Sequence, residues 1–404
     1  MNGSTNSEKM KRFLTFASLA FLVTTGGFSQ VFGKLGFDLP IIDLDGEEGI
    51  QIVIDKEKDQ YLGHPTTVLL GDGKTIICVY PKGHGKGGIV MKKSIDGGKT
   101  WSDRLKTPES WGTSKEVPTI YPTTDAKGKD RLIMFSGAQH RFQEVIRMAV
   151  SEDQGETWSE LKGIGDYTGI VAMADCIPLK NAGHYLATFH TQGPEKTMIL
   201  YQVESLDGGL TWGEPKELYR ASSHHLCEAG LIYSPDKSEI AMLLRENARN
   251  YNSQIMFSSD EGKTWSKPKP MPGSLNGDRH QGIYMPDGRL LIQFRDNTPR
   301  NRPGNVMSPT EGDWVGWVGS WDDLKNGYEG QFRIRFKDNT KDWDSTYPAA
   351  ELLPDGTLFC TTYGHWDEGE QPYILSFRFK TDLLNNKLTE QRKKALEKIQ
   401  NIMK

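Results

Sequence analysis

The sequence predicts an all-β fold, a six-bladed β-propeller followed by a C-terminal helix, and two internal repeats support this prediction. The first repeat is the pattern Ser-x-Asp-x-Gly-x-Thr-Trp, which occurs four times and is called a box turn below. The box turns cover residues 94–101, 151–158, 205–212 and 258–265. Their aspartates lie 57, 54 and 53 residues apart, and a near-constant period of that size is typical of propellers and solenoids. The second repeat is a hairpin that occurs six times.

The chemistry of the box turn suits the tip of a hairpin on the outside of a blade. Its Ser and Asp side chains can bond the amides of the turn, Gly supplies a positive φ, and Trp can fill the gap between adjacent sheets. Such a turn identifies architecture, so we do not expect it to form a functional site. We expect a fifth, eroded copy at Ser320-Trp321-Asp322 and none in the last blade.

Each of the six hairpins joins an apolar strand, a tight turn and a second apolar strand that ends in polar residues. The hairpins cover residues 69–80, 129–136, 181–189, 234–245, 286–295 and 354–362. Turns of this kind between alternating apolar residues are strong hairpin signals. Together the six units fill roughly residues 61–380, which sets the number of blades at six.

The two ends of the chain have different compositions from this body. Basic residues precede an apolar run over 13–23, and small residues then precede Gln30, which predicts a signal peptide over 1–29. The run is too short to span a bilayer, and no Cys follows it that could carry a lipid, so we expect a secreted or periplasmic protein. Residues 30–60 form a lead-in segment, and residues 381–404 have the spacing of an amphipathic helix packed on the propeller wall.

Composition excludes some partners and cofactors. The net charge of −4, without a basic patch, argues against nucleic acid as a partner. The wide spacing of the four cysteines, in apolar strands of different blades, favours buried free thiols over disulfides. No Cys-x-x-Cys or His-x-x-x-His spacing occurs, so neither a metal nor another cofactor is expected. The cysteines are Cys78, Cys176, Cys227 and Cys360.

Ionisable residues recur at the ends of the inner strands, which converge around the axis of a propeller. Burying unpaired charge is costly, so this recurrence predicts a functional site. The candidate inner strands carry His64, Glu116, Asp175, Glu228, Arg279 and Tyr347. The neighbouring strands end in His84, His140, His190, Arg245, Arg295 and His365.

The box turns, the blade count and the segments around Glu228 and Tyr347 resemble the bacterial sialidases, over roughly residues 55–380. The resemblance implies hydrolysis of a terminal sialic acid by a tyrosine nucleophile, which a glutamate activates. It also implies three arginines that grip the sugar carboxylate and an aspartate that serves as acid and base. On the matching positions, Tyr347 is the nucleophile, Glu228 activates it, and Arg245 and Arg295 bind substrate. Arg300 and Arg302 are nearby alternatives to Arg295.

These assignments agree with elementary chemistry. A phenol has an ordinary pKa near 10 and needs a neighbouring carboxylate to become nucleophilic near neutral pH. A planar guanidinium group matches a carboxylate with two parallel hydrogen bonds. We therefore expect Glu228 and Tyr347 at hydrogen-bonding distance, and Arg245 and Arg295 on the same rim. With Lys82, Lys86 and His84 they would attract an anionic ligand. The alternative is that the arginines pair with Glu246 and Asp296.

The departures from the family are also informative. Gly63-His64-Pro65 stands where the family has Arg-Ile-Pro, and the family's acidic residue would fall near Gly88. The carboxylate that supports the missing arginine is replaced by the stretch 363–366. A coordinated loss predicts a rebuilt subsite, in which His64, His84 and Glu116 contact substrate. The candidates for the acid are Asp175, Glu116 and His84, in that order.

Three functions remain open on the sequence alone. The retained Glu228, Arg245 and Tyr347 favour an exo-acting glycosidase that cleaves a terminal acidic sugar from a glycan. The missing arginine and aspartate favour a non-catalytic carbohydrate-binding propeller. A polysaccharide lyase would use Tyr347 with histidines such as His64, His84 and His365 to abstract a proton. The fold alone does not decide among the three.

Overall fold

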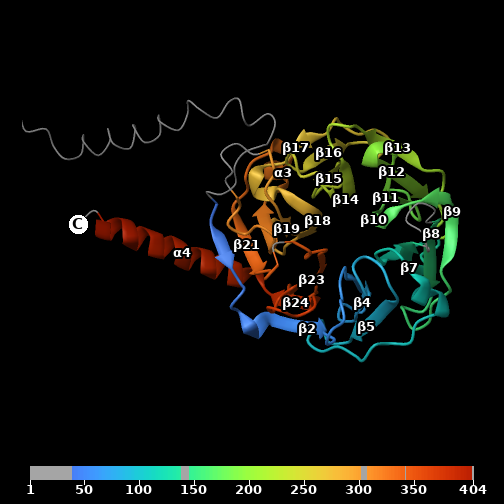
Figure 1. Ribbon diagram of the computed structural model, residues 1–404, viewed down its shortest axis with the longest axis horizontal. Helices are drawn as coiled ribbons and strands as arrows, with labels where there is room; N and C mark the ends of the chain where they lie inside the picture. The colour runs from blue at the N-terminus through green and yellow to red at the C-terminus, as the bar shows by residue number, and fades with distance from the viewer. Residues whose placement is uncertain (1–38, 138–144, 302–306, 342, 403–404) are drawn as a thin grey trace, which may run out of the picture.

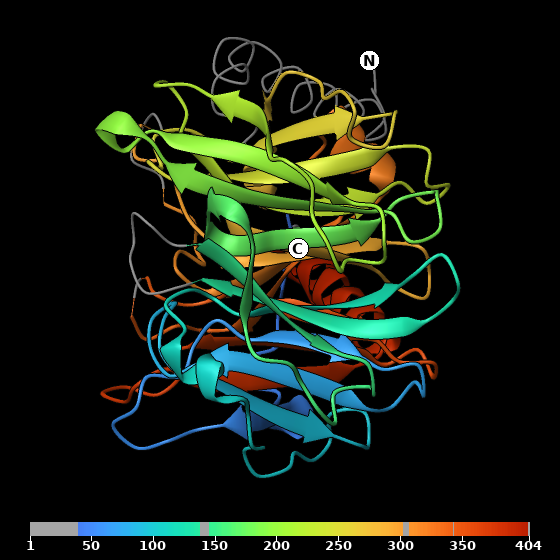
Figure 2. The same ribbon diagram turned by 90° about the vertical axis from the view of Figure 1, so that its right-hand side faces the viewer.

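The computed structural model describes residues 39–402 except 138–144, 302–306 and 342. The expected signal peptide, His140 and Arg302 therefore lie outside the described residues. Six sheets surround a central axis (Figure 1), which confirms the six-bladed β-propeller. Figure 2 shows the same ring from its edge, with the strands of successive blades stacked above one another.

The first three blades follow one another along the chain, each as an antiparallel meander from the inside outward. Blade 1 contains β3, β4 and β5, at Thr66–Leu69, Ile76–Pro81 and Ile89–Ser94. Blade 2 contains β6 to β9, at Thr119–Thr124, Asp130–Gly137, Val145–Ser151 and Lys162–Thr168. Blade 3 contains β10 to β13, at Ile170–Pro178, Tyr185–Gln192, Met198–Ser205 and Lys216–Arg220.

The last three blades repeat this order and begin with β14, β18 and β22. Blade 4 contains β14 to β17, at Leu226–Tyr233, Ile240–Glu246, Gln254–Ser258 and Lys269–Pro270. Blade 5 contains β18 to β21, at Gly277–Tyr284, Leu290–Asp296, Trp314–Gly319 and Phe332–Lys337. Blade 6 contains β22 to β24, at Ala349–Leu352, Leu358–Gly364 and Tyr373–Phe379. Short 3₁₀ helices span Glu48–Ile50, Glu109–Thr113, Pro194–Lys196 and Gly273–Leu275.

The segment before the first blade completes two other blades. Strand β2 (Gln51–Asp55) pairs antiparallel with β24 and is the outermost strand of blade 6. Strand β1 (Ile41–Asp43) pairs parallel with β21 at the edge of blade 5. The lead-in segment expected over 30–60 thus contributes two strands to the ring, and blade 6 joins the two ends of the propeller.

The box turns hold each blade to the one before it. In the first box, Ser94 Oγ donates to Asp96 Oδ1 at 2.8 Å, and Thr100 Oγ1 donates to Asp96 Oδ2 at 2.6 Å. Gly98 has φ +81°, and a Cβ there would lie 2.6 Å from the Phe359 ring of blade 6, so only glycine fits. The Trp101 ring lies 5.9 Å from the same phenyl ring, between centroids. The expected placement of the box tryptophan between sheets is confirmed here.

The expected fifth box at Ser320-Trp321-Asp322 is wrong. This segment starts helix α3 (Trp321–Asn326) instead of a turn. Ser320 Oγ accepts the Asp323 amide at 3.0 Å, and Asp323 Oδ2 accepts the Ser320 amide at 2.8 Å. An acidic residue three positions after a serine binds a free amide at the start of a helix. This capping box forms here in place of the expected box turn.

The C-terminal helix is confirmed as α4 (Thr381–Ile402). Leu384 and Leu388 are buried against blades 5 and 6, whereas Leu396, Ile399 and Ile402 are exposed. Only the first turns pack on the wall, and the rest extends away from the ring (Figure 1). No helix among the described residues is both long and apolar enough to cross a membrane. All four cysteines are free and buried, as expected.

Candidate active site

Strained backbone marks the ends of the inner strands around the axis. Five residues other than glycine have a positive φ at these ends: His64, Val171, Glu228, Arg279 and Thr346, between +48° and +59°. Such conformations are costly for residues with a Cβ and cluster at active sites. Bulges interrupt the ladders of β14 and β18 at the same level. A bulge redirects side chains, which here turns functional groups of several blades toward one another.

The Tyr347 hydroxyl donates to Glu228 Oε1 at 2.6 Å. This is the hydrogen-bonding distance that the sequence predicts. Both side chains are buried, with 8% and 5% of each residue exposed. Among the described residues, Glu228 Oε2 has no hydrogen-bond partner, so this buried oxygen can take up a proton.

Glu228 is ionised and Tyr347 is neutral because their surroundings shift the two pKa values in opposite directions. Burial on its own would raise the pKa of Glu228, but Arg245, His190 and the Tyr347 hydroxyl outweigh it and lower the pKa. Arg245 Nη1 donates to Glu228 Oε1 at 3.0 Å. Burial and the Glu228 carboxylate raise the pKa of Tyr347 well above its usual value. The resting pair is therefore a carboxylate that accepts a proton from a neutral phenol.

Three arginines converge on one carboxylate, Asp278, next to this pair. Arg295 Nη2 and Arg249 Nη2 each lie 2.6 Å from Asp278 Oδ2. Arg245 Nε lies 3.2 Å from Asp278 Oδ1, as an ion pair without the alignment of a hydrogen bond. Asn297 Nδ2 donates to the same oxygen at 2.8 Å. Burial opposes ionisation, but the arginines hold the pKa of Asp278 well below its usual range.

Arg245 and Arg295 thus meet at the same carboxylate, and the alternative, a pairing with Glu246 and Asp296, is wrong. Glu246 instead accepts the backbone amides of His225 and Asn250, at 3.0 and 2.8 Å. Asp296 pairs with Arg333 at 2.9 Å. Sequence reasoning missed Asp278, although a buried counter-charge is what two neighbouring buried arginines require.

Arg279 was expected on an inner strand and lies beside the nucleophile candidate. Its guanidinium carbon is 5.6 Å from the centre of the Tyr347 ring, a cation–π contact. The residue is 8% exposed. Arg279 therefore adds a fourth guanidinium group to the surroundings of Tyr347 and Glu228.

A second cluster centres on Asp344. Asp344 Oδ1 accepts from the Tyr61 hydroxyl at 2.7 Å and lies 2.8 Å from His84 Nδ1. Asp344 Oδ2 lies 3.2 Å from His365 Nε2. Burial opposes ionisation, but hydrogen bonds from these neighbours hold the pKa of Asp344 well below its usual range. The sequence analysis missed both Asp344 and Tyr61.

His64 connects the two clusters. Its ring centroid lies 4.4 Å from that of Tyr347 and 4.9 Å from that of His84, edge-on in both cases. Its Nδ1 accepts the Gly85 amide at 3.2 Å, and its Nε2 lies 3.1 Å from the Tyr363 hydroxyl. Burial lowers the pKa of His64 well below its usual value. A neutral His64 therefore packs against Tyr347.

Two of the candidate acids, Asp175 and Glu116, bind backbone amides. Asp175 lines a cavity of about 220 Å³ between the inner strands, and its carboxylate accepts the amides of Leu231 and Cys176, at 2.7 and 2.8 Å. Burial raises the pKa of Asp175. Glu116 Oε2 accepts the Val171 amide at 2.7 Å. Both carboxylates connect neighbouring blades through backbone amides.

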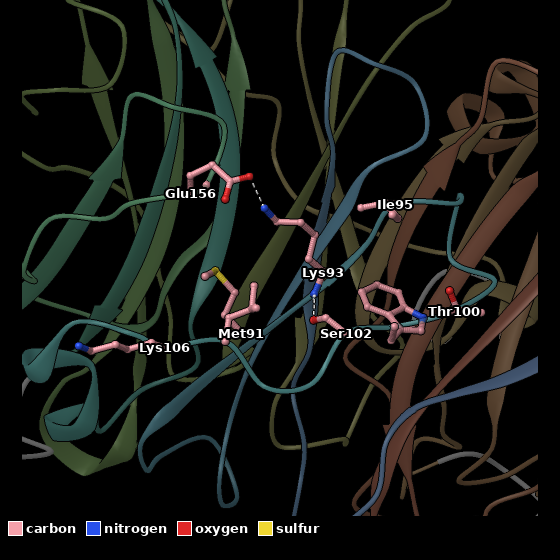
Figure 3. A pocket seen from close by; sticks show the side chains of 10 residues that line it. Met91, Lys93, Ile95, Thr100, Ser102, Lys106 and Glu156 are labelled. Atoms are coloured by element: carbon pink, nitrogen blue, oxygen red, sulfur yellow. Dashed lines mark hydrogen bonds and ion pairs between the residues drawn. The ribbon is translucent and has the colours of Figure 1, made fainter.

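Two further features lie outside these clusters. Lys82 was expected to add positive charge to the site, but it pairs with Glu57 at 3.1 Å. A separate pocket of about 470 Å³ lies between the outer strands of blades 1 and 2 (Figure 3). There Lys93 Nζ donates to Glu156 Oε1 at 2.6 Å. None of the residues of the clusters around Tyr347 and Asp344 lines this pocket.

The curated relatives that match the chain are sialidases. No family model matches the chain. A sialidase of Clostridium perfringens is 26% identical over 255 residues, which cover 58% of this chain and 56% of that protein. The chain is similar to the sialidases. It spans about half the length of the curated relatives that it matches.

Solved structures support the fold. The NanB sialidase of Streptococcus pneumoniae has a TM-score of 0.56 at 13% identity, over 82% of this chain and 71% of that one. The α-L-arabinofuranosidase Arb93A of Fusarium graminearum has a TM-score of 0.60 at 12% identity, over 82% of this chain and 98% of that one. The described residues contain no group of three or more His, Cys, Asp or Glu side chains that could hold a metal ion.

Proposed function

We propose that this protein is an exo-acting glycoside hydrolase in which Tyr347 is the nucleophile and Glu228 is its base. The observation that carries the proposal is the 2.6 Å hydrogen bond from the buried Tyr347 hydroxyl to the Glu228 carboxylate. A base within hydrogen-bond reach is what activates a weak nucleophile. The similarity to sialidases and the fold shared with glycosidases support the same reaction class.

In the proposed reaction, Tyr347 Oη bonds to the anomeric carbon, the glycosidic C–O bond breaks and releases the leaving group, and the phenol proton passes to Glu228. Arg245 donates to the same carboxylate oxygen as Tyr347, so it holds Glu228 in place and keeps it ionised before the reaction. The product of this step is a glycosyl–tyrosine intermediate, which water then hydrolyses. Two displacements at one carbon retain its configuration.

The arginine cluster supports a substrate with an acidic sugar. Asp278 is fully buried, whereas the side chains of Arg245 and Arg249 are 13% and 26% exposed, so the carboxylate lies behind the guanidinium groups. Three guanidinium groups, of Arg245, Arg249 and Arg295, face the two carboxylates of Glu228 and Asp278, and the guanidinium group of Arg279 lies over the Tyr347 ring. The excess of one positive charge around the two carboxylates favours an anionic group.

One observation favours a neutral sugar instead. Asp278 already forms an ion pair with one nitrogen of each of three arginines. Part of their positive charge is therefore balanced inside the protein. An α-L-arabinofuranosidase shares the fold. A hydrolase of a neutral terminal sugar is therefore the second candidate, with the same roles for Tyr347 and Glu228.

The test is a screen of wild-type protein and Tyr347→Phe with aryl glycosides of sialic acid, uronic acids and arabinofuranose. We expect turnover of an acidic glycoside and a loss of at least about 100-fold in kcat in Tyr347→Phe, with unchanged thermal unfolding. The exposed Tyr328 provides the control Tyr328→Phe, which should keep full activity. Sugar binding without turnover would instead support a non-catalytic propeller, and an unsaturated product would support a lyase.

We also propose that the protein is exported, because residues 1–29 have the composition of a signal peptide. Expression with its own N-terminus, followed by N-terminal sequencing of the exported protein, should give a chain that starts at Gln30. A protein retained in the cell with residues 1–29 intact would contradict this.

A further inference from the structure

We propose that His84, positioned by Asp344, is the proton donor to the leaving group and the base that activates water. This inference rests on the proposed hydrolase function and names a further catalytic residue for it. It assigns a role to the cluster around Asp344.

The geometry of His84 is that of an oriented acid. It lies in the loop between β4 and β5, and its side chain is 58% exposed. His84 Nδ1 faces Asp344 Oδ1 at 2.8 Å and the Tyr61 hydroxyl at the same distance. Among the described residues, no side chain binds Nε2, which lies on the other side of the ring. A carboxylate on Nδ1 holds the imidazole in a fixed orientation.

His84 is close to the nucleophile candidate. The ring of His64 packs edge-on against both His84 and Tyr347, so a single imidazole separates them. For His84 to protonate it, the leaving-group oxygen must bind beside this imidazole, between His84 and Tyr347.

The other candidate acids and the histidines around Asp344 are already engaged. Both ring nitrogens of His64 are hydrogen-bonded, and its ring is buried. Both ring nitrogens of His365 have partners, Asp344 and the Glu370 carbonyl. Asp175 and Glu116 bind backbone amides, and Asp344 accepts from several donors, so it stays ionised. His84 therefore combines an unengaged nitrogen with exposure to solvent.

The reaction balances with these groups. In the first step, Tyr347 Oη bonds to the anomeric carbon, Glu228 takes the phenol proton, the glycosidic C–O bond breaks, and protonated His84 gives its proton to the leaving oxygen. In the second step, neutral His84 takes a proton from water, whose oxygen bonds to the anomeric carbon. The C–O bond to Tyr347 breaks, and Glu228 returns the proton to the phenol. The net reaction consumes one water molecule.

Several charged or titratable groups face His84 and Asp344 from the surrounding elements. Tyr61 and His64 belong to the segment before blade 1, and Tyr363 and His365 come from β23 and the segment after it. Lys341 Nζ lies 4.0 Å from Asp344 Oδ2. Activity should therefore be compared at one pH between variants of the same site, so that these groups remain constant.

The experiment compares wild-type protein, His84→Gln and Asp344→Asn on an aryl glycoside and an alkyl glycoside of the same sugar. An aryloxide leaves without help, whereas an alkoxide needs an acid. For His84→Gln we expect kcat/KM to fall less than about 10-fold on the aryl substrate and at least about 100-fold on the alkyl substrate. Added azide should raise the turnover of the aryl substrate, because it replaces the water that needs a base.

Asp344 is a positioning residue, so its test is the split between kcat and KM. In Asp344→Asn kcat should fall more on the alkyl than on the aryl glycoside while KM stays unchanged, because His84 keeps its ring but loses the carboxylate that orients it. His184→Gln, on the turn between β10 and β11, should match wild type in both tests.

Equal losses on both leaving groups in His84→Gln, with Tyr347→Phe inactive, would overturn the role of His84 and leave the hydrolase proposal intact. A wild-type protein that turns over no glycoside, or a fully active Tyr347→Phe, would overturn the proposed function and this inference together. Thermal unfolding of each variant separates a loss of chemistry from a loss of fold.

Discussion

Replacing Asp278 with asparagine should destabilise the protein more than any surface charge change. The side chain is fully buried and serves as counter-charge to Arg245, Arg249 and Arg295. Arg249 is 26% exposed and can be hydrated, and Arg245 keeps Glu228 as a partner. Arg295 is 7% exposed and would lose its carboxylate partner. Breaking a buried ion pair from one side costs about 3–5 kcal/mol, which is the loss we expect near neutral pH.

The pH dependence of this loss has a definite sign. The arginines depress the pKa of Asp278 in the folded state, relative to about 3.9 in the unfolded chain. The stability from the ionised group is therefore complete above about pH 4 and disappears as the pH falls toward the folded-state pKa. The difference in unfolding free energy between wild type and Asp278→Asn should be largest near neutral pH and shrink in acid.

Urea denaturation at several pH values measures this difference. The matched control is Asp287→Asn, because Asp287 also pairs with an arginine, Arg289, but its side chain is 35% exposed. An exposed pair contributes about 1 kcal/mol or less, so the control should remain close to wild type. The reasoning fails if Asp278→Asn loses less than about 1 kcal/mol near neutral pH, or if its loss is the same in acid.

Three further predictions use other parts of the molecule. Arg245→Lys should weaken binding of an acidic glycoside by about 10- to 100-fold in calorimetry, since lysine keeps the charge but loses the planar fork; unchanged affinity would favour the neutral sugar. Asp207→Ala removes the acceptor of Ser205 and Thr211 in the third box turn, so it should cost about 1 kcal/mol of stability and leave glycoside affinity unchanged. Burial raises the pKa of Cys78 and Cys360, so a thiol reagent should label neither of them before unfolding; rapid labelling of the native protein would contradict their burial.

The fold could be predicted because it repeats. Each box turn and hairpin is determined by a few neighbouring residues, and the same local pattern recurs in blade after blade. The segment at Ser320 shows the limit of this reasoning, since Ser followed by Asp also begins a helix when the acid stands three residues later. The strands that β1 and β2 add to blades 5 and 6 depend on pairing across most of the chain, which a local pattern does not reveal.

The candidate site could be predicted only in part for a similar reason. Glu228, Arg245, Arg295 and Tyr347 stand at recognisable positions relative to their hairpins. Tyr61 and Asp344 meet across 283 residues, in a contact that exists only once the ring closes. Asp175 binds the amides of Leu231 and Cys176 because the pairing of β10 with β11 shifts register just before it. The sequence gives no sign of this register shift.

The most direct test of the proposed mechanism is to find the covalent intermediate. A fluorinated glycosyl fluoride of the sugar that the enzyme accepts slows the second step and lets the glycosyl–enzyme accumulate. Intact mass spectrometry should then show one sugar per protein, and peptide mapping should place it on Tyr347. A sugar on a carboxylate, or hydrolysis with inverted configuration and no labelled protein, would contradict the tyrosine nucleophile.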